Sequence, residues 1–178
     1  YIKALGSPWV QFNGHTLNLS HRQIEILCIL ALHPYGIGLD ELHYALYGER
    51  NVSIKTLKAE LSQLRSLLPH CIEARIYRLS CEVQCDFLRA EKSLNANLIS
   101  STFSLYKGSF LSKSESPLLS TWRHCFDARL SQLIYQIKDI DQLLRIIGQT
   151  HDRIDAVQRL LELLPQDSIH RNYFSNLI

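Results

Sequence analysis

The stretch from residue 53 to residue 68 constrains the fold of this chain more than any other segment. Leucine and isoleucine recur along it at helical spacing, which predicts an amphipathic helix with one buried side: Ile54, Leu57, Leu61, Leu64 and Leu68. Pro69 predicts the end of this helix, because proline has no backbone N–H to donate. A second row of side chains lies roughly 100° round the helix from the apolar one: Lys55, Lys58, Ser62 and Arg65.

The same helix belongs to a locally basic segment. Residues 50–78 contain six lysines and arginines against two glutamates. A positive helix face followed by a basic hairpin is the pattern expected of a protein that binds DNA phosphates. A solvated charged face is the alternative interpretation of such a row, and the order of the neighbouring elements argues against it.

The residues before this helix predict a small antiparallel sheet. Extended segments at 2–5, 9–12 and 16–19 are separated by turn residues. The second separator is Asn13-Gly14, and Asn-Gly between alternating apolar residues is a strong hairpin signal.

Two more helices and a hairpin complete the first half of the chain. Ser20 and Gln23 have the spacing of a capping box and predict a helix that ends at His33-Pro34. A shorter helix is predicted over 39–47, with Gly48 as its stop. Residues 73–79 and 82–86 then have the pattern of a β-hairpin.

Strands, three helices and a hairpin in this order predict a winged helix-turn-helix domain over residues 1–86. In such domains the second helix of the motif enters the major groove of double-stranded DNA, and the first crosses the backbone. Lysine and arginine neutralise phosphates, and small polar side chains contact phosphates or base edges. The candidate DNA-binding residues are therefore Lys55, Thr56, Lys58, Ser62, Gln63 and Arg65 on the helix, with Arg75 and Arg78 in the wing.

From residue 87 onward the pattern is helical throughout. Helices are predicted near 87–98, 101–107, 118 to beyond 137, 141–147, 153–164 and 168–178. The fold class is thus an α+β winged helix-turn-helix followed by an all-α domain over 87–178. We expect this second domain to relay a signal, to form a homodimer or to contact RNA polymerase.

The sequence argues against other classes of protein. No apolar run approaches the roughly 20 residues of a membrane span, and no signal peptide is recognisable, so a cytoplasmic location is expected. The eight histidines are scattered, and neither a Gly-rich phosphate loop nor a nucleophile elbow occurs. We therefore expect no enzymatic activity, no cofactor and no metal. His21 with Glu25, and His151 with Asp155, have the spacing of pairs on a helix surface.

The five cysteines match no zinc-binding pattern. Cys81 and Cys85 are four residues apart, which places them on one face if they lie in a strand. A redox pair is one interpretation of this spacing, and buried thiols without a redox role are the favoured one.

Several short motifs resemble known families. Leu61-Ser-Gln-Leu-Arg65 and Tyr47-Gly48 resemble the recognition helix and the end of the preceding helix in OmpR/PhoB-type winged helices. More specifically, the chain is similar to the C-terminal half of bacterial GAF-domain-containing transcriptional regulators. Six segments carry this similarity: Leu39 to Gly48, Thr56 to Arg65, Tyr77-Arg-Leu79, Tyr106 to Leu111, Ser114-Glu-Ser-Pro117 and Leu163 to Asp167. The tail more weakly resembles the bacterial transcriptional activator domain.

This resemblance implies a transcriptional regulator with a small-molecule sensor upstream. The absence of methionine, even at position 1, likewise predicts that the natural chain begins earlier. Two departures from the family pattern stand out. Ala74-Arg-Ile-Tyr77 lacks the glycines common in such wings, and Glu60 lies inside the expected reading helix, where it would repel phosphate unless it accepts from a cytosine amino group.

A second function remains open from the sequence. Residues 1–86 contain eight basic and eight acidic residues, and this balance favours a helical protein-interaction adaptor whose winged helix does not bind DNA. Salt-dependent binding to duplex DNA distinguishes the two functions.

Overall fold

The computed structural model describes residues 1–150, 152–166 and 168–176. Its N-terminal strands are β1 (Ile2–Lys3), β2 (Trp9–Phe12) and β3 (His15–Leu17), which form an antiparallel sheet in that order. Val10 lies opposite both Ile2 and Leu17, so the central strand is paired on both edges. The predicted sheet is confirmed, although its third strand ends at Leu17 and not at Leu19.

Three helices follow, as predicted: α1 (His21–Leu32), α2 (Leu39–Tyr47) and α3 (Ile54–Leu67). The capping box at the start of α1 is present, because the Ser20 hydroxyl accepts from the Gln23 amide and the Gln23 side chain accepts from the Ser20 amide. Gly48 ends α2 with a φ of 61°, a left-handed conformation that glycine adopts at low cost.

The hairpin after α3 has a different register from the predicted one. Its arms are 71–73 and 78–80, joined by the Glu73 amide to the Arg78 carbonyl and the Ser80 amide to the Cys71 carbonyl. Residues 82–86 are not its second arm. The Ile2 amide donates to the Gln84 carbonyl at 2.8 Å, so this segment extends the N-terminal sheet beside β1.

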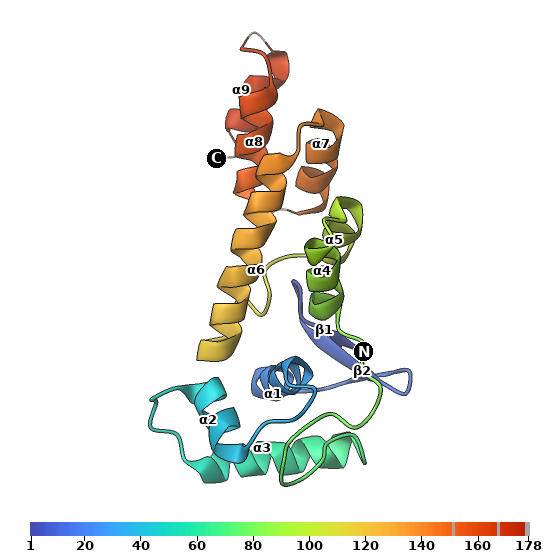
Figure 1. The fold of residues 1–178 in the computed structure, drawn as a ribbon, viewed down its shortest axis with the longest axis vertical. Helices are drawn as coiled ribbons and strands as arrows, with labels where there is room; N and C mark the ends of the chain where they lie inside the picture. Colours follow the sequence, from blue (N-terminus) through green and yellow to red (C-terminus); the bar gives the residue numbers. More distant parts are fainter. Residues whose placement is uncertain (151, 167, 177–178) are drawn as a thin grey trace.

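The second half is helical, with α4 (Asp86–Asn95), α5 (Ile99–Leu105), α6 (Pro117–Gln136), α7 (Ile140–Gln149), α8 (Ile154–Leu163) and α9 (Ile169–Ser175). The long helix α6 rises from the winged helix to the level of α7 and α8 (Figure 1). It ends at Gln136, whereas the sequence predicted a helix that continues beyond Ile137. Residues 177–178 of the last predicted helix, Asp167 of the Leu163–Asp167 motif and His151 lie outside the described residues.

One extended conformation in the second half was not predicted. Phe110 pairs with Leu5 in an antiparallel bridge, and the Leu111 amide donates to the Ala4 carbonyl. The loop after α5 therefore joins the edge of the N-terminal sheet.

A single buried core runs from β1 to α8. Asp86, only 2% exposed, accepts hydrogen bonds from the backbone amides of Ala4, Leu5 and Phe87. This carboxylate ties the start of α4 to the N-terminal sheet. The division into domains 1–86 and 87–178 stays a prediction, since the two segments share this core.

Glu25 links α1 to the segment before α6. The expected pair of His21 and Glu25 is present, with the ring nitrogen 3.6 Å from the carboxylate, but Glu25 is 1% exposed and therefore does not lie on the surface. The carboxylate pairs with Arg22 at 2.7 Å and accepts from the Ser114 hydroxyl. A buried carboxylate needs such partners, because desolvation of an unpaired charge is costly.

Candidate nucleic-acid interface

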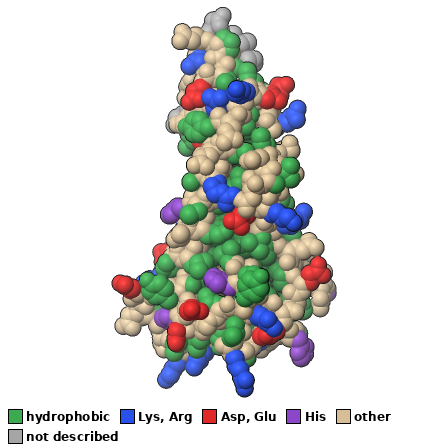
Figure 2. All heavy atoms as spheres, viewed as in Figure 1, with side chains coloured by type: hydrophobic (Ala, Val, Ile, Leu, Met, Phe, Trp, Pro, Cys, Tyr) green, Lys and Arg blue, Asp and Glu red, His purple; other side chains and the backbone are tan. Residues whose placement is uncertain are grey.

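Helix α3 lies at the end of the molecule farthest from α7, α8 and α9 (Figure 1). The Ser53 hydroxyl caps it by accepting from the Lys55 amide. Its apolar row is buried, with Leu57 and Leu64 fully enclosed, which fixes the rotation of the helix about its axis. Lys and Arg side chains project from this end of the molecule (Figure 2).

The fixed rotation exposes five of the predicted DNA-binding residues on α3. They are Lys55, Thr56, Lys58, Ser62 and Gln63. Within the described part of the chain, the side chain of neither lysine makes a hydrogen bond or an ion pair with another residue. Two ammonium groups one helical turn apart are therefore available to an anion outside the protein.

Three of the basic residues in the segment are already bound to protein groups. Arg50 pairs with Glu115 at 2.6 Å and donates to the Tyr47 carbonyl, so it holds the end of α2 against the segment before α6. The Arg78 guanidinium binds the Glu73 carboxylate through two hydrogen bonds of 2.8 and 2.9 Å. This pairing lowers the pKa of Glu73 and raises that of Arg78.

Arg65 is the third of these basic residues, and it joins α3 to the wing. Its guanidinium donates to the Glu73 carbonyl and lies 5.3 Å from the centre of the Tyr77 ring. Cation–π stacking and a carbonyl partner direct this side chain along the protein surface. Arg65 thus positions the hairpin relative to α3.

Two further residues of α3, the exposed Gln63 and the half-buried Glu60, contact neighbouring protein groups. Gln63 accepts a hydrogen bond of 2.9 Å from the buried Gln23 side chain. One carboxylate oxygen of Glu60 is enclosed by protein, and the Glu60 charge contributes to raising the pKa of Tyr47 on α2, an effect due mainly to burial. Glu60 is therefore half-buried on the side of α3 nearest Tyr47, with its negative charge still on the candidate DNA-binding helix.

The wing forms without glycine at its tip. Arg75 adopts a φ of 78°, a left-handed conformation that costs a side-chain-bearing residue about 1 kcal/mol. The hairpin instead packs against a glycine from another part of the chain, Gly36. A Cβ on Gly36 would collide with the Ile76 side chain. Ile37 and Tyr77 exchange two backbone hydrogen bonds of 2.9 and 3.0 Å beside this contact. The exposed Arg75 is therefore presented by a hairpin that is anchored to the α1–α2 turn.

The neighbour of Cys81 is Cys71 and not Cys85, the partner in the alternative redox interpretation. Cys81 lies beside Cys71 across the base of the hairpin, and both line a cavity of about 230 Å³ next to the N-terminal sheet. Burial, together with a hydrogen bond to Cys81, raises the pKa of Cys71 to about 11. Burial raises the pKa of Cys85 to about 12, so neither buried thiol is ionised at neutral pH.

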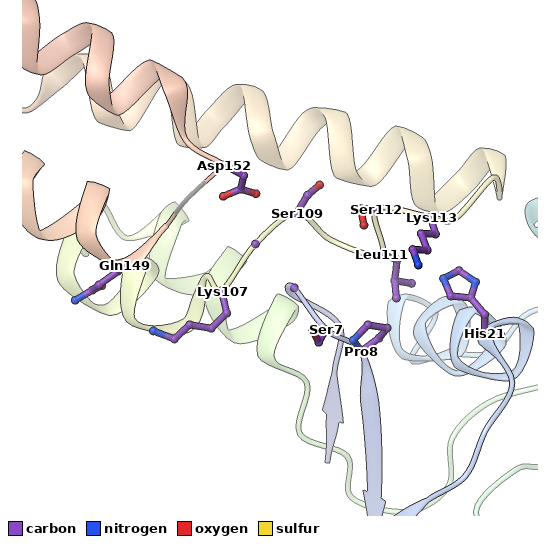
Figure 3. Close-up of a pocket in the computed structure, with 12 residues that line it drawn as sticks. Ser7, Pro8, His21, Lys107, Ser109, Leu111, Ser112, Lys113, Gln149 and Asp152 are labelled. Atoms are coloured by element: carbon purple, nitrogen blue, oxygen red, sulfur yellow. The ribbon is translucent and has the colours of Figure 1, made fainter. Parts of the chain in front are cut away.

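A second cavity, of about 660 Å³, lies between the β1–β2 turn, the start of α1 and residues 107–113 (Figure 3). Lys107 lies near Gln149 at one end, whereas Lys113 lies beside His21 at the other (Figure 3). Its cationic groups do not converge on one point. Among the described residues, no three His, Cys, Asp or Glu side chains are grouped as a metal site, and no helix has the length and apolarity that a membrane span requires.

Comparison with known proteins supports the fold. The sequence matches no family model. It is 29% identical over 153 residues to an uncharacterized 47.3 kDa protein in the thcA 5'region of Rhodococcus erythropolis, a match that covers 85% of this chain and 35% of that protein. The chain thus spans about a third of its curated relative.

Among solved structures, the chain is similar to Mycobacterium tuberculosis EmbR in complex with a low affinity phosphopeptide. The TM-score is 0.57 and the identity 18%, over 99% of this chain and 55% of that one. The likeness therefore extends over both halves of the chain. It confirms the predicted fold class, a winged helix-turn-helix followed by a largely helical region.

Proposed function

We propose that this chain is the DNA-binding output portion of a transcriptional regulator whose remaining length holds a small-molecule sensor. The observation that carries the proposal is the row of Lys55 and Lys58 on a helix whose rotation is fixed by its buried leucines. A pre-positioned cationic row binds phosphates without first having to be ordered. The winged-helix fold supports the same function.

In the proposed complex, α3 enters the major groove and α2 crosses the backbone. Lys55 and Lys58 neutralise phosphates, while Thr56 and Ser62 contact base edges or phosphates. Arg75 at the tip of the wing binds the adjacent backbone or the minor groove. Gln63, Arg65 and Arg78 contribute directly only if they exchange their present protein partners for DNA.

The helical half is proposed to transmit the signal. Arg50 with Glu115, and Glu25 with Ser114, connect the winged helix to the segment that leads into α6. Movement of α6 would therefore reach α1 and α2 directly. Contact of this half with RNA polymerase, or with a second copy of the chain, is part of the same proposal.

A salt titration tests DNA binding itself. Fluorescence anisotropy with a labelled duplex of random sequence should give an affinity that falls as salt rises, with a log–log slope of about −3 if three cations contact phosphates. The adaptor function predicts no binding to the duplex. Footprinting of the full-length protein on the DNA upstream of its own gene would then locate a specific site.

Replacing Glu73 with glutamine should strengthen DNA binding. The exchange frees the Arg78 guanidinium from its bidentate partner, so one more cation becomes available to phosphate. We expect the salt slope to steepen by up to about one unit. Glu82→Gln is the matched control, because Glu82 is exposed and makes no described ion pair. Equal slopes for the two variants would place Arg78 away from DNA.

A further inference from the structure

An open apolar groove lies where α1 and α2 meet α6, on the opposite side of α2 from its contact with α3. It has a volume of about 1000 Å³. Hydrophobic side chains gather over these elements in the lower half of the molecule (Figure 2). The principal apolar side chains are Leu32, Ile37, Tyr44, Ala45, Leu118 and Trp122.

The walls of the groove are formed by two helices, α2 and α6, and this arrangement suits a helical partner. Asp40, Glu41, Tyr44 and Ala45 line it from two turns of α2, and the residues of α6 that line it also recur at helical spacing, from Pro117 to Cys125. A third helix laid between two helical walls packs its side chains into their grooves. An amphipathic helix bound in an apolar groove is a recurrent mode of recognition.

The groove combines an indole packed on another ring with an exposed phenol ring. The Trp122 ring stacks on Phe126, with centroids 4.9 Å apart and planes 13° from parallel. Tyr44 is 62% exposed, although its ring lines the groove. An exposed aromatic ring beside a fixed indole is the kind of surface that supplies most of the energy of a protein interface.

The charge of the groove selects the partner. Its lining residues include the carboxylates of Asp40 and Glu41 but neither lysine nor arginine. Glu41 also caps α2 by accepting from the Gly38 amide, whereas the Asp40 carboxylate makes no hydrogen bond or ion pair with a described residue. This surface therefore repels DNA phosphates and favours a cationic partner.

We propose that this groove binds an amphipathic helix of another protein, with apolar side chains against Tyr44 and Trp122 and lysine or arginine beside Asp40 and Glu41. No residue of α3 or of the hairpin lines the groove, although the hairpin is hydrogen-bonded to its lining residue Ile37 through Tyr77. The proposal does not depend on DNA binding.

The test uses a synthetic amphipathic peptide of about 18 residues, long enough to form a helix on binding. Leucines at helical spacing form one face, and lysines flank it. One control peptide carries glutamate at the lysine positions, and a second carries the same residues with the leucines scrambled. The exposed Cys125 thiol lines the groove, so its alkylation by a maleimide should slow as the first peptide is added. Fluorescence of Trp122, measured in a Trp9→Phe background, gives the affinity.

Substitutions locate the binding site. Tyr44→Ala should weaken binding of the lysine peptide by at least about tenfold, and Asp40→Asn by about twofold to fivefold, as for an exposed ion pair. Glu49→Gln, an exposed carboxylate outside the groove, should leave the affinity unchanged. Unchanged thermal unfolding of the Tyr44 variant would show that the exposed ring is not needed for folding.

Three results would overturn the proposal. Equal binding of the glutamate or scrambled peptide would exclude a basic amphipathic helix as the partner. Unchanged affinity in Tyr44→Ala would place the peptide elsewhere. Protection of Cys125 that grows with protein concentration alone would show that a second copy of this chain covers the groove instead.

Discussion

Replacing Lys55 and Lys58 together with alanine is expected to weaken DNA binding by about thirtyfold at roughly 0.15 M salt, from the loss of counterion release alone. The log–log slope of affinity against salt should become shallower by about 1.8 units, because two phosphate contacts are lost. The loss should be similar for specific and random duplexes, since phosphate contacts carry no sequence information. Fluorescence anisotropy over a salt series measures both quantities.

The double variant has a matched control. Lys107→Ala with Lys138→Ala removes the same net charge from exposed positions in the helical half and should leave the slope unchanged. Both variants should unfold at the temperature of the unsubstituted protein, because exposed lysines without protein partners contribute little to stability. If the Lys55 and Lys58 variant kept its slope, α3 would not be the helix that contacts DNA.

Replacing Asp86 with alanine should lower the free energy of unfolding by about 3 kcal/mol, because the backbone amides of Ala4, Leu5 and Phe87 lose their acceptor in a buried site. For a chain of this length we expect the unfolding temperature to fall by roughly 6–12 °C. Thermal and urea unfolding followed by circular dichroism measure the change. Glu82→Ala, which removes an exposed carboxylate nearby, should change stability by less than about 0.5 kcal/mol.

The ionisation of Asp86 gives a second readout of the same site. Burial raises the pKa of this carboxyl in the folded protein, against the lowering effect of its backbone hydrogen bonds. A group with a raised folded-state pKa binds more protons in the folded than in the unfolded state. Its contribution to stability is therefore full below the unfolded-state pKa of about 3.9 and declines as pH rises through the raised value. The difference in stability between the unsubstituted protein and Asp86→Asn should follow this curve; a difference independent of pH would contradict the assigned shift.

Local periodicity explains why the helices and the candidate DNA-binding row could be predicted. The spacing of Leu57, Leu61 and Leu64 determines which side of α3 is buried, and the position of Lys55 and Lys58 relative to that side follows from helical geometry. The capping box at Ser20 and the stop at Gly48 depend on residues within one turn of the helix end. These features require no knowledge of distant contacts.

The protein partners of the other basic residues could not be predicted from local periodicity. Residues 50–78 carry six basic side chains, but Arg50 is bound by Glu115, and Arg65 lies against Tyr77. Sequence spacing does not show such partners, because residue 115 reaches Arg50 only when α6 packs on α2. The basic character of the segment was therefore a guide to its location and an overestimate of its free charge.

By itself the sequence determined the identity and order of the helices, the buried face of α3 and the exposure of Lys55 and Lys58, because each depends on short-range periodicity and on end-capping. Only the tertiary structure decided the register of the wing, which Gly36 and Ile37 set from a different part of the chain. The partial burial of Glu60 and the groove between α2 and α6 also depend on the tertiary structure. Both arise where separate elements pack together, and the geometry of such contacts is set by the whole core and not by any one segment.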